Sequence, residues 1–462
     1  MESGSKQLSK YVEDLKFKDL SEEVVYRLKQ HILDTLGCIF HGFPSHSASI
    51  TRKLLLGKVE EATIIGTNKK DSCITATLAN GVALRQSEYL DYLPSPLNPF
   101  AVCHPSEAIP AALAIAEKVD SSGKDFLLSV FISYELHGRF CVAMRTSSLS
   151  AAGFHHTTLG YLIQPLVIGK LLNLKAEQLA NAMGISGCMA NAGIIDAEEE
   201  EFAEVKNIAY PIAAQASIIA TLLAKDGFTG TERVLEGEKG FMKSILRENM
   251  DFDALLKGGE RPWIFETRLK PYPIVGAGIG IIDATLNLVK KYSINPSDVE
   301  NILVKSSKKT VTHICDPAKK HPKTKESADH SAYFLVAVAI LEKKVTPDLF
   351  RDDVLSSLLS NTTVHELSDK ITFEVSPELN DPKLYPAAEV IIKIKSGLEY
   401  SHKALYPKGH PKNPMSEKEV EEKFLQGASS ILGENKAREV IKAVYRLDKM
   451  RNISELTELL RT

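Results

Sequence analysis

The feature that most constrains the fold is a series of long apolar segments with helical periodicity in the first half of the chain. They lie at Glu22–Phe40, Ile74–Leu90, Ser106–Val119, Lys124–Met144, Gly160–Leu172, Ala176–Ala192 and Pro211–Leu223. Several, such as IPAALAIA and PIAAQASIIATLLA, are apolar around most of their circumference. Because such helices need cover on more than one side, the pattern predicts a helical body whose inner helices lie between other helices or at a subunit contact.

The pattern changes after Trp263. An apolar helix is predicted over Ile279–Lys291, and another over His330–Lys343. Runs rich in β-branched residues, typical of strands, lie at Asn301–Val311, Ile371–Val375 and Ala388–Lys395. Ser396-Gly397 follows the last run and predicts a hairpin turn.

Amphipathic helix returns from Ser416 to Arg461, and Ser416 followed by Glu417 and Glu419 is a good helix start. We therefore predict a mainly α fold. Residues 1–263 and 403–462 are expected to form a large all-helical domain, and residues 264–402 an inserted, smaller α+β lid domain.

Composition narrows the class of partner. The chain has 56 basic and 59 acidic side chains and a net charge of −3, without the basic excess typical of nucleic-acid binding. It has no run of roughly 18 apolar residues and no secretory signal, so we expect a cytoplasmic protein outside the membrane. The six cysteines are scattered and do not indicate a disulfide framework or a metal site. GAGIG at 276–280 has no strand before it, so it predicts close backbone packing rather than a nucleotide site.

A Pro-rich loop between two predicted helices carries the first candidate site residues. His104 stands shortly before Ser106, which is a good N-cap, so an imidazole and free backbone N–H groups would point toward one carboxylate-bearing ligand. Asp91, at the other end of the loop, could orient that histidine. The alternative is a helix-capping loop with a surface histidine.

Two lysines and a histidine pair are further candidates. Lys206 precedes an apolar helix and could bind a carboxylate, or it could simply neutralise the acidic run Glu198–Glu201. Lys270 precedes two prolines near the predicted domain junction, where ligand clefts are common, but it could equally be a hinge lysine. His155 and His156 lie in a loop, and at most one of them is expected to be functional.

These stretches resemble the MmgE/PrpD family, which contains 2-methylcitrate dehydratase, cis-aconitate decarboxylase and an iminodisuccinate epimerase. The resemblance runs nearly end to end and rests on the order and spacing of many short motifs. They are LKQHILDTLGCIFHG (28–42), ANGVALRQSEYLDY (79–92), HPSEAIPAALAIAE (104–117), YELHGRF (134–140), GFHHT (153–157), the Lys206 segment, DGFTGTERVLEGEKGF (226–241), LKPYP (269–273), SADHSAYFLVAVAIL (327–341) and GHPKNPMSEKEVEEKF (409–424).

The resemblance implies a homodimer without metal or organic cofactor and with its active site between the domains. By position, Asp91 matches the family's loop aspartate, His104 its HPS histidine and His155 its GFH histidine. Lys206 and Lys270 match its two active-site lysines. We assign Asp91, His104 and Lys206 as catalytic and Ser95, His155 and Lys270 as substrate-binding.

Three departures from the family pattern bear on the activity. The second acid of the loop is lost, since Pro94 stands there, and Ser95 replaces a threonine. An ungapped alignment would place Glu88 at the first acid, but the spacing of Asp91 to His104 fits better. The histidine expected after the KPYP-like motif is missing, with Val275 and Gly276 in its place.

A histidine and glycine pair is also missing after Lys206, where Ala209 and Pro211 stand. The resemblance favours a cofactor-independent lyase, a dehydratase or decarboxylase, acting on a small di- or tricarboxylate such as 2-methylcitrate or cis-aconitate. One alternative is an epimerase or isomerase of a similar acid, which needs less leaving-group assistance. Another is a catalytically inactive dimer that keeps the fold. The sequence leaves the substrate open.

Overall fold

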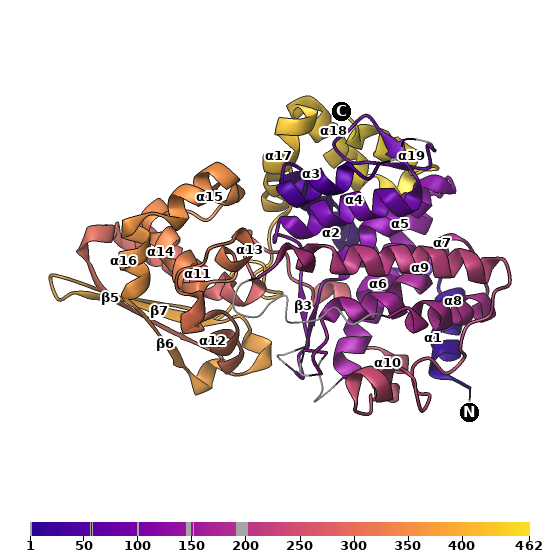
Figure 1. The fold of residues 1–462 in the computed structure, drawn as a ribbon, viewed down its shortest axis with the longest axis horizontal. Helices are drawn as coiled ribbons and strands as arrows, with labels where there is room; N and C mark the ends of the chain where they lie inside the picture. Colours follow the sequence, from indigo (N-terminus) through magenta and orange to yellow (C-terminus); the bar gives the residue numbers. More distant parts are fainter. Residues whose placement is uncertain are drawn as a thin grey trace. The chain divides into compact units, whose positions relative to one another are not determined.

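The computed structural model describes residues 2–55, 57, 59–98, 101–144, 149–150, 152–190 and 202–462. These residues form two compact units, and Figure 1 shows their helices and strands. The first unit takes in the described residues of 1–195, 207–267 and 416–462. The second takes in those of 196–206 and 268–415. The boundaries 264 and 402 for an inserted lid domain remain a proposal.

Helices make up most of the first unit. They are α1 (Gly4–Asp14), α2 (Glu22–Gly42), α3 (His46–Arg52), α4 (Cys73–Gln86), α5 (Ile109–Lys118), α6 (Gly123–Ala143), α7 (Gly160–Leu171), α8 (Ala176–Cys188), α9 (Ala209–Lys225), α10 (Phe252–Lys257), α17 (Glu417–Leu432), α18 (Glu434–Tyr445) and α19 (Ser454–Thr457). Two short antiparallel pairs accompany them, β1 (Ala62–Thr63) with β2 (Lys70–Asp71) and β3 (Leu93–Pro94) with β4 (Val102–Cys103). The chain is mainly helical, as its periodicity predicts.

Serine side chains begin many of these helices. Ser21 and Ser122 each accept a hydrogen bond from the backbone N–H three residues further on, which satisfies a donor that the helix leaves unpaired. Ser416 and Glu419 form a full capping box at the start of α17. The helix start predicted at Ser416 is therefore confirmed.

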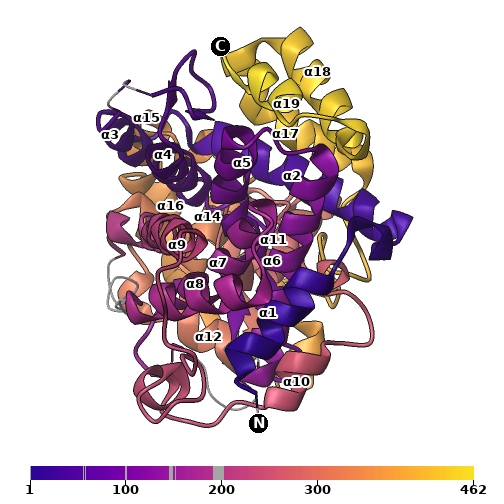
Figure 2. The same ribbon diagram turned by 90° about the vertical axis from the view of Figure 1, so that its right-hand side faces the viewer.

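The inner helices of the first unit are covered on all sides. Every residue of α7 except Lys170 is buried, and α7 packs against α5, α6, α8 and α9. Figure 2 shows α7 among these neighbours. The expectation that segments apolar around their circumference lie between other helices is confirmed for α6, α7 and the IPAALAIA segment of α5. The PIAAQASIIATLLA segment of α9 instead leaves Ile212, Ile219 and Leu223 exposed.

Two helical segments are long and apolar enough to pass a membrane-span test, Gly123–Ala143 and Glu204–Lys225. Charged residues lie within both segments, so neither is one of the uninterrupted apolar runs on which the sequence-based expectation rested. The apolar window of the first segment is 94% buried inside the structure, and that of the second is 56% buried. Buried core helices of water-soluble proteins have the same length and composition.

Two helix boundaries in the first unit differ from the predicted ones. α4 ends at Gln86, four residues before the predicted Leu90, because Glu88 adopts a left-handed backbone with φ of 47° that cannot continue a helix. The segment predicted to begin at Ser106 starts instead as a 3₁₀ turn, Pro105–Ala108, which leads into α5. The predicted helix end at Ala192 falls outside the described residues.

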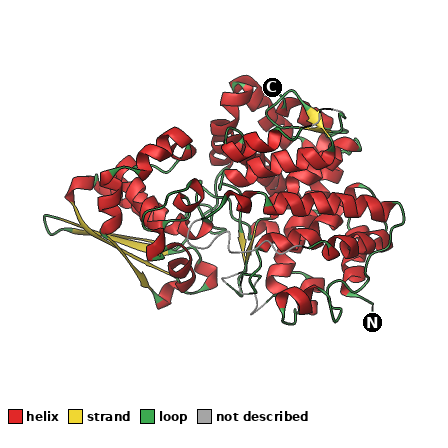
Figure 3. Cartoon of the chain, in the orientation of Figure 1, coloured by secondary structure: helices red, strands yellow, loops and turns green. Residues whose placement is uncertain are grey.

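The second unit is built on a four-stranded sheet in the order β6-β5-β7-β8, drawn in yellow in Figure 3. The strands are β5 (Val299–Ser306), β6 (Ile371–Val375), β7 (Ala388–Ile394) and β8 (Glu399–Ala404). β5 runs parallel to β6 and antiparallel to β7, which forms an antiparallel hairpin with β8. Gly397, with φ of 87°, lies in the hairpin turn, as predicted.

The helices of the second unit are α11 (Ile279–Tyr292), α12 (Lys308–Ile314), α13 (Lys325–Ala328), α14 (Ala332–Glu342), α15 (Asp352–Leu359) and α16 (Thr362–Asp369). α11 packs against β7, β8 and α14. A Cβ atom at Gly280 would lie 1.9 Å from the carbonyl oxygen of Pro386, so GAGIG provides close packing at a helix start, as predicted.

One strand prediction is wrong at its end. The run Asn301–Val311 was expected to be extended throughout, but β5 stops at Ser306 and α12 begins at Lys308. The side chain of Ser307 accepts a hydrogen bond from the Thr310 N–H, and this N-cap outweighs the β-branched composition of the residues that follow.

Candidate active site

The loop that follows α4 is held in place by the fully buried carboxylate of Asp91. One oxygen accepts hydrogen bonds from His31 Nδ1 on α2, at 2.9 Å, and from the Tyr134 hydroxyl on α6, at 2.7 Å. The other accepts from the hydroxyl of Ser106 at 2.6 Å and from its backbone N–H at 3.3 Å. Both oxygens are thus occupied, and Asp91 acts as an anchor for the loop.

These donors keep Asp91 ionised. Burial alone would raise the pKa of Asp91, but the hydrogen bonds from His31, Ser106 and Tyr134 outweigh it and hold the pKa below its usual value. Burial lowers the pKa of His31, which therefore donates as a neutral imidazole. Burial and the Asp91 charge raise the pKa of Tyr134 well above its usual value, so the phenol keeps its proton.

Ser106 does not cap α5, contrary to the sequence-based expectation. Its hydroxyl donates to Asp91, and the residue in the N-cap position of the 3₁₀ turn is His104, whose side chain makes no capping hydrogen bond. The Asp91 carboxylate recruits the serine because a buried charge needs every available donor. The predicted capping role of Ser106 is therefore wrong, and whether His104 takes part in the chemistry stays a prediction.

His104 is oriented by the backbone of Asp91. Its Nδ1 donates a hydrogen bond to the Asp91 carbonyl oxygen, so the proton of a neutral His104 lies on Nδ1. The side chain is partly buried, and its ring centroid lies 4.9 Å from that of His156. Nε2 is therefore the His104 atom suited to take up and release a proton.

The adjacent histidines differ in environment. His155 is buried, and its Nδ1 lies 2.9 Å from the Thr157 hydroxyl. His156 is partly exposed, and its Nε2 lies 3.4 Å from a carboxylate oxygen of Glu107. The sequence motif favoured His155, and its substrate-binding role stays a prediction. Neither Glu107 nor a role for His156 was identified from the sequence, which offers no local signal for their pairing.

Ser95 forms a local turn in the same loop. Its hydroxyl accepts hydrogen bonds from the backbone N–H groups of Leu97 and Asn98, each at 3.3 Å. The side chain is 1% exposed. Its contact with substrate stays a prediction.

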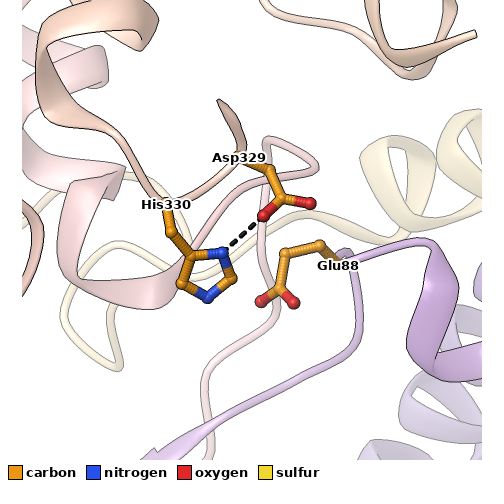
Figure 4. Close-up of side chains that lie close together, drawn as sticks. All are labelled: Glu88, Asp329 and His330. Carbon is orange, nitrogen blue, oxygen red and sulfur yellow. Dashed lines mark hydrogen bonds and ion pairs between the residues drawn. The ribbon is translucent and has the colours of Figure 1, made fainter. Parts of the chain in front are cut away.

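A second buried carboxylate, Asp329 in the second unit, lies among cations. Lys325 Nζ is 2.8 Å from one carboxylate oxygen, and Lys206 Nζ is 3.9 Å from the other. His330 Nδ1 forms a hydrogen bond with the same oxygen that faces Lys206, as Figure 4 shows. Burial alone would raise the pKa of Asp329, but Lys325, Lys206 and His330 outweigh it, so the pKa is lowered.

Phe202 connects the Lys206 segment to the cluster around Asp329. The Phe202 N–H donates to the Ser327 hydroxyl at 2.8 Å, and its ring centroid lies 4.5 Å from that of His330. The ammonium groups of Lys319 and Lys206 lie 4.6 Å and 5.4 Å from the Phe202 ring centroid. Lys206, Lys319 and Lys325 thus place several positive charges around the Asp329 carboxylate and the Phe202 ring.

Asp329 and His330 were missed as site residues by the sequence reasoning. They lie in the short connection between α13 and α14, where Ser331 accepts from the Phe334 N–H and begins α14. The motif SADHSAYFLVAVAIL that contains them carried the family resemblance but received no chemical role. Its adjacent acid and histidine, just before a helix, were the available signal.

The predicted site residues fall into two groups. Asp91, His104, Ser95 and His155 belong to the first unit, where Asp91 and His104 are in direct contact. Lys206 and Lys270 belong to the second unit, and both side chains are buried. That the two groups serve one substrate stays a prediction.

Two further predictions concern the surroundings of Lys206. Val275, which replaces the expected histidine, is buried, and its N–H donates to the Asp329 carbonyl at 3.0 Å. The backbone at this position therefore supports the cluster, although its side chain cannot transfer a proton. The acidic run Glu198–Glu201, whose charge Lys206 could have neutralised, lies outside the described residues.

Comparison with known proteins identifies the family. This chain belongs to the MmgE/PrpD family, whose N-terminal domain matches residues 6–253 and whose C-terminal domain matches residues 272–449. The family predicted from the motifs is confirmed.

The relatives include named enzymes. Cis-aconitate decarboxylase of Aspergillus terreus is 25% identical to this chain over an alignment that covers 97% of the chain and 94% of that protein. The human cis-aconitate decarboxylase is 26% identical over an alignment that covers 97% of the chain and 93% of that protein. An alkylcitrate dehydratase from a fungal species is 22% identical over an alignment that covers 85% of the chain and 81% of that protein. Decarboxylases and dehydratases are lyases, so the comparisons support an enzyme of that class.

Proposed function

We propose that this chain is a cofactor-independent lyase, a dehydratase or decarboxylase, acting on a small di- or tricarboxylate such as 2-methylcitrate or cis-aconitate. The observation that carries the proposal is the orientation of His104, whose Nδ1 donates to the Asp91 carbonyl and whose Nε2 is thereby suited to proton transfer. The names of the decarboxylase and dehydratase relatives support the same chemistry.

The reaction would proceed through a carbanion or enolate next to a carboxylate. In a dehydration, His104 Nε2 would remove the proton α to a carboxylate, and another group would protonate the departing hydroxyl. In a decarboxylation, the same Nε2, protonated, would return a proton to the product carbanion. Asp91, whose oxygens are occupied, would act by fixing the loop and the His104 tautomer.

Lysines would hold the charge of the substrate. Lys206 belongs to a cluster in which Lys325 and His330 already balance Asp329, so its ammonium is suited to bind a substrate carboxylate. Lys270, Ser95 and His155 are proposed to contribute further substrate contacts. This assignment requires His104 and Lys206 to serve one substrate, which a structure with a bound tricarboxylate would test.

The direct test is a panel of citrate-like and aspartate-like acids incubated with the protein in deuterium oxide and followed by NMR. A new alkene with loss of water, or release of carbon dioxide, is the expected result. Deuterium uptake without net conversion would replace the lyase with an isomerase or epimerase. No reaction and no exchange with any acid would favour an inactive dimer.

His104→Gln is expected to lower turnover about 100-fold or more while leaving folding intact, because it removes a proton-transfer group that buries little surface. Turnover is measured with the acid that gives the highest rate in the panel, and folding by circular dichroism. His46→Gln, on the exposed start of α3, is the control and should keep full activity. Near-normal turnover by His104→Gln would remove this residue from the chemistry.

We also propose a homodimer formed through the helical unit. Ile212, Ile219 and Leu223 lie along one side of α9 and are 40%, 42% and 38% exposed, which is unusual for large aliphatic side chains at this spacing. A second copy of the chain would cover them. Light scattering is expected to give the mass of a dimer at micromolar concentration, and a monomer would contradict the proposal.

A further inference from the structure

Glu107 places a buried negative charge next to the candidate site. It lies in the 3₁₀ turn that follows His104, and its side chain is 1% exposed. One carboxylate oxygen is 3.3 Å from Arg85 Nε on α4, and the other is 3.4 Å from His156 Nε2. Because a buried carboxylate needs compensation, these two partners define its role.

His156, rather than His155, is the histidine that faces His104. The His156 ring centroid lies 4.9 Å from the His104 ring and 4.0 Å from the His155 ring. His104 and the His156 side chain, which is 20% exposed, are both partly accessible, whereas His155 is buried against Thr157. When two accessible imidazoles lie side by side, one is suited to remove a proton from a substrate and the other to donate a proton to it.

The charges around this pair favour different protonation states for its two members. Arg85 is permanently charged and lies 3.3 Å from one Glu107 oxygen, and a carboxylate 3.4 Å from His156 Nε2 favours the imidazolium form of His156. His104 has the His156 charge beside it and a carbonyl oxygen at Nδ1, which favours its neutral form with Nε2 able to accept a proton.

The charge of Glu107 also affects the pKa values of other buried groups. Burial raises the pKa of Tyr210 well above its usual value, and the Glu107 charge adds to that rise. Burial lowers the pKa of His137, and the Glu107 charge opposes this shift. Among the described residues, the titratable or charged groups near the Glu107–His156 pair include Arg85, Asp91, Cys103, His104, His137, His155 and Tyr210.

We propose that Glu107 is a positioning residue that keeps His156 protonated, and that the His156 imidazolium is the general acid of a dehydration. The inference rests on the proposed lyase function. His104 Nε2 takes the proton α to a carboxylate, and the electron pair of that C–H bond forms the new C=C bond. The C–O bond breaks, and His156 gives its Nδ1 proton to the leaving hydroxyl, which departs as water. Neutral His156 keeps its Nε2 proton toward Glu107.

This pair would supply the acid that the family pattern leaves missing here. Val275 stands where a histidine was expected, and Pro94 where a second loop acid was expected. A decarboxylation needs a single group to reprotonate the product, whereas a dehydration needs both a base and an acid. The Glu107–His156 pair therefore favours a hydroxylated di- or tricarboxylate as the substrate class.

The first test needs no substrate. The protein is labelled with ¹³C at histidine Cε1 and titrated by NMR, and the signals are assigned with His104→Gln, His155→Gln and His156→Gln. His156 is expected to titrate at higher pH than His104. Glu107→Gln should lower the His156 midpoint by about one unit or more, because an opposite charge at this distance shifts a pKa by roughly 1–3 units.

The matched control is Glu117→Gln, which neutralises another buried glutamate at the far end of the following helix, where Thr63 and Lys70 contact it. It should leave both histidine midpoints unchanged. If Glu107→Gln fails to fold, His156→Gln keeps the Arg85–Glu107 pair and should raise the His104 midpoint by removing the neighbouring charge. An unmoved His156 midpoint in Glu107→Gln, or an unmoved His104 midpoint in His156→Gln, would overturn the pairing.

The second test is activity on hydroxylated acids. Glu107→Gln and His156→Gln are each expected to lower kcat about 10-fold or more with little change in KM, and the double variant should lose no more than His156→Gln alone. The alkaline limb of the pH profile should move to lower pH in Glu107→Gln. If the histidine midpoints shift as expected but no acid is turned over, the proposed lyase function would be refuted, whereas the Glu107–His156 ion pair would be supported. Turnover with unchanged kcat in His156→Gln would refute the general acid alone.

Discussion

Asp91 and Asp329 are both fully buried aspartates, yet they are stabilised in different ways. Asp91, in the helical first unit, accepts from the neutral His31 ring, two hydroxyl groups and a backbone N–H. Asp329, in the second unit, is in contact with Lys325, Lys206 and His330. Both pKa values are lowered, the first chiefly by hydrogen bonds and the second chiefly by charge.

The difference assigns a different task to each of the two units. Neutral donors have fixed directions, so the Asp91 network sets the geometry of the loop that orients His104. Ammonium groups act over longer distances and with less directionality, so the Asp329 cluster acts chiefly through charge. Breaking either network should therefore have different consequences.

The largest effect is expected from Asp329→Asn. This change removes the carboxylate that the buried Lys206 and the partly buried Lys325 share, and it should lower the free energy of unfolding of the second unit by roughly 3–5 kcal/mol. Hydrogen exchange of the amides in α14, compared with those in α7, would localise the loss to that unit. Adding Lys325→Met to Asp329→Asn should recover much of the lost stability, because it removes the unbalanced positive charge. A double variant no more stable than Asp329→Asn would contradict the view that Asp329 is stabilised chiefly by charge.

Lys206→Met tests the other cation of the cluster. Lys206 is 3.9 Å from Asp329, whereas Lys325 is 2.8 Å away, so the loss of Lys206 should affect substrate more than folding. We expect KM to rise roughly 10- to 100-fold, because a charge-assisted hydrogen bond contributes about 1.5–3 kcal/mol. Steady-state kinetics provides the measurement. Lys320→Met, which removes a partly exposed lysine paired with Asp369, is the control. A fall in kcat at constant KM would reassign Lys206 to proton transfer.

Asp91→Asn is expected to have the smallest effect on stability. The amide keeps one acceptor oxygen and replaces the other with a donor, so two of the neutral donors lose their partner at a cost of about 1–3 kcal/mol. The loss of stability would be measured by denaturant unfolding monitored through hydrogen exchange of the amides in α2 and α6. A loss as large as that of Asp329→Asn would remove the distinction between the two aspartates.

The sequence by itself determined the features that depend on neighbouring residues. Apolar periodicity predicted α6 and α7, Ser416 with Glu419 predicted the start of α17, and Ser396-Gly397 predicted the hairpin turn. The motifs around His104 identified the family. In each case the controlling interactions span only a few residues, so their pattern can be read along the chain.

Tertiary structure alone decided which groups meet. Asp91 binds His31 and Tyr134, which are 60 and 43 residues away in sequence, and Lys206 contacts His330, which is 124 residues away. Those contacts redirected the Ser106 hydroxyl from the expected cap to a buried carboxylate, and packing placed His156 rather than His155 beside His104. The physical reason is that a buried charge takes donors from whichever elements the fold brings near it, and their separation in sequence carries no signal of that proximity.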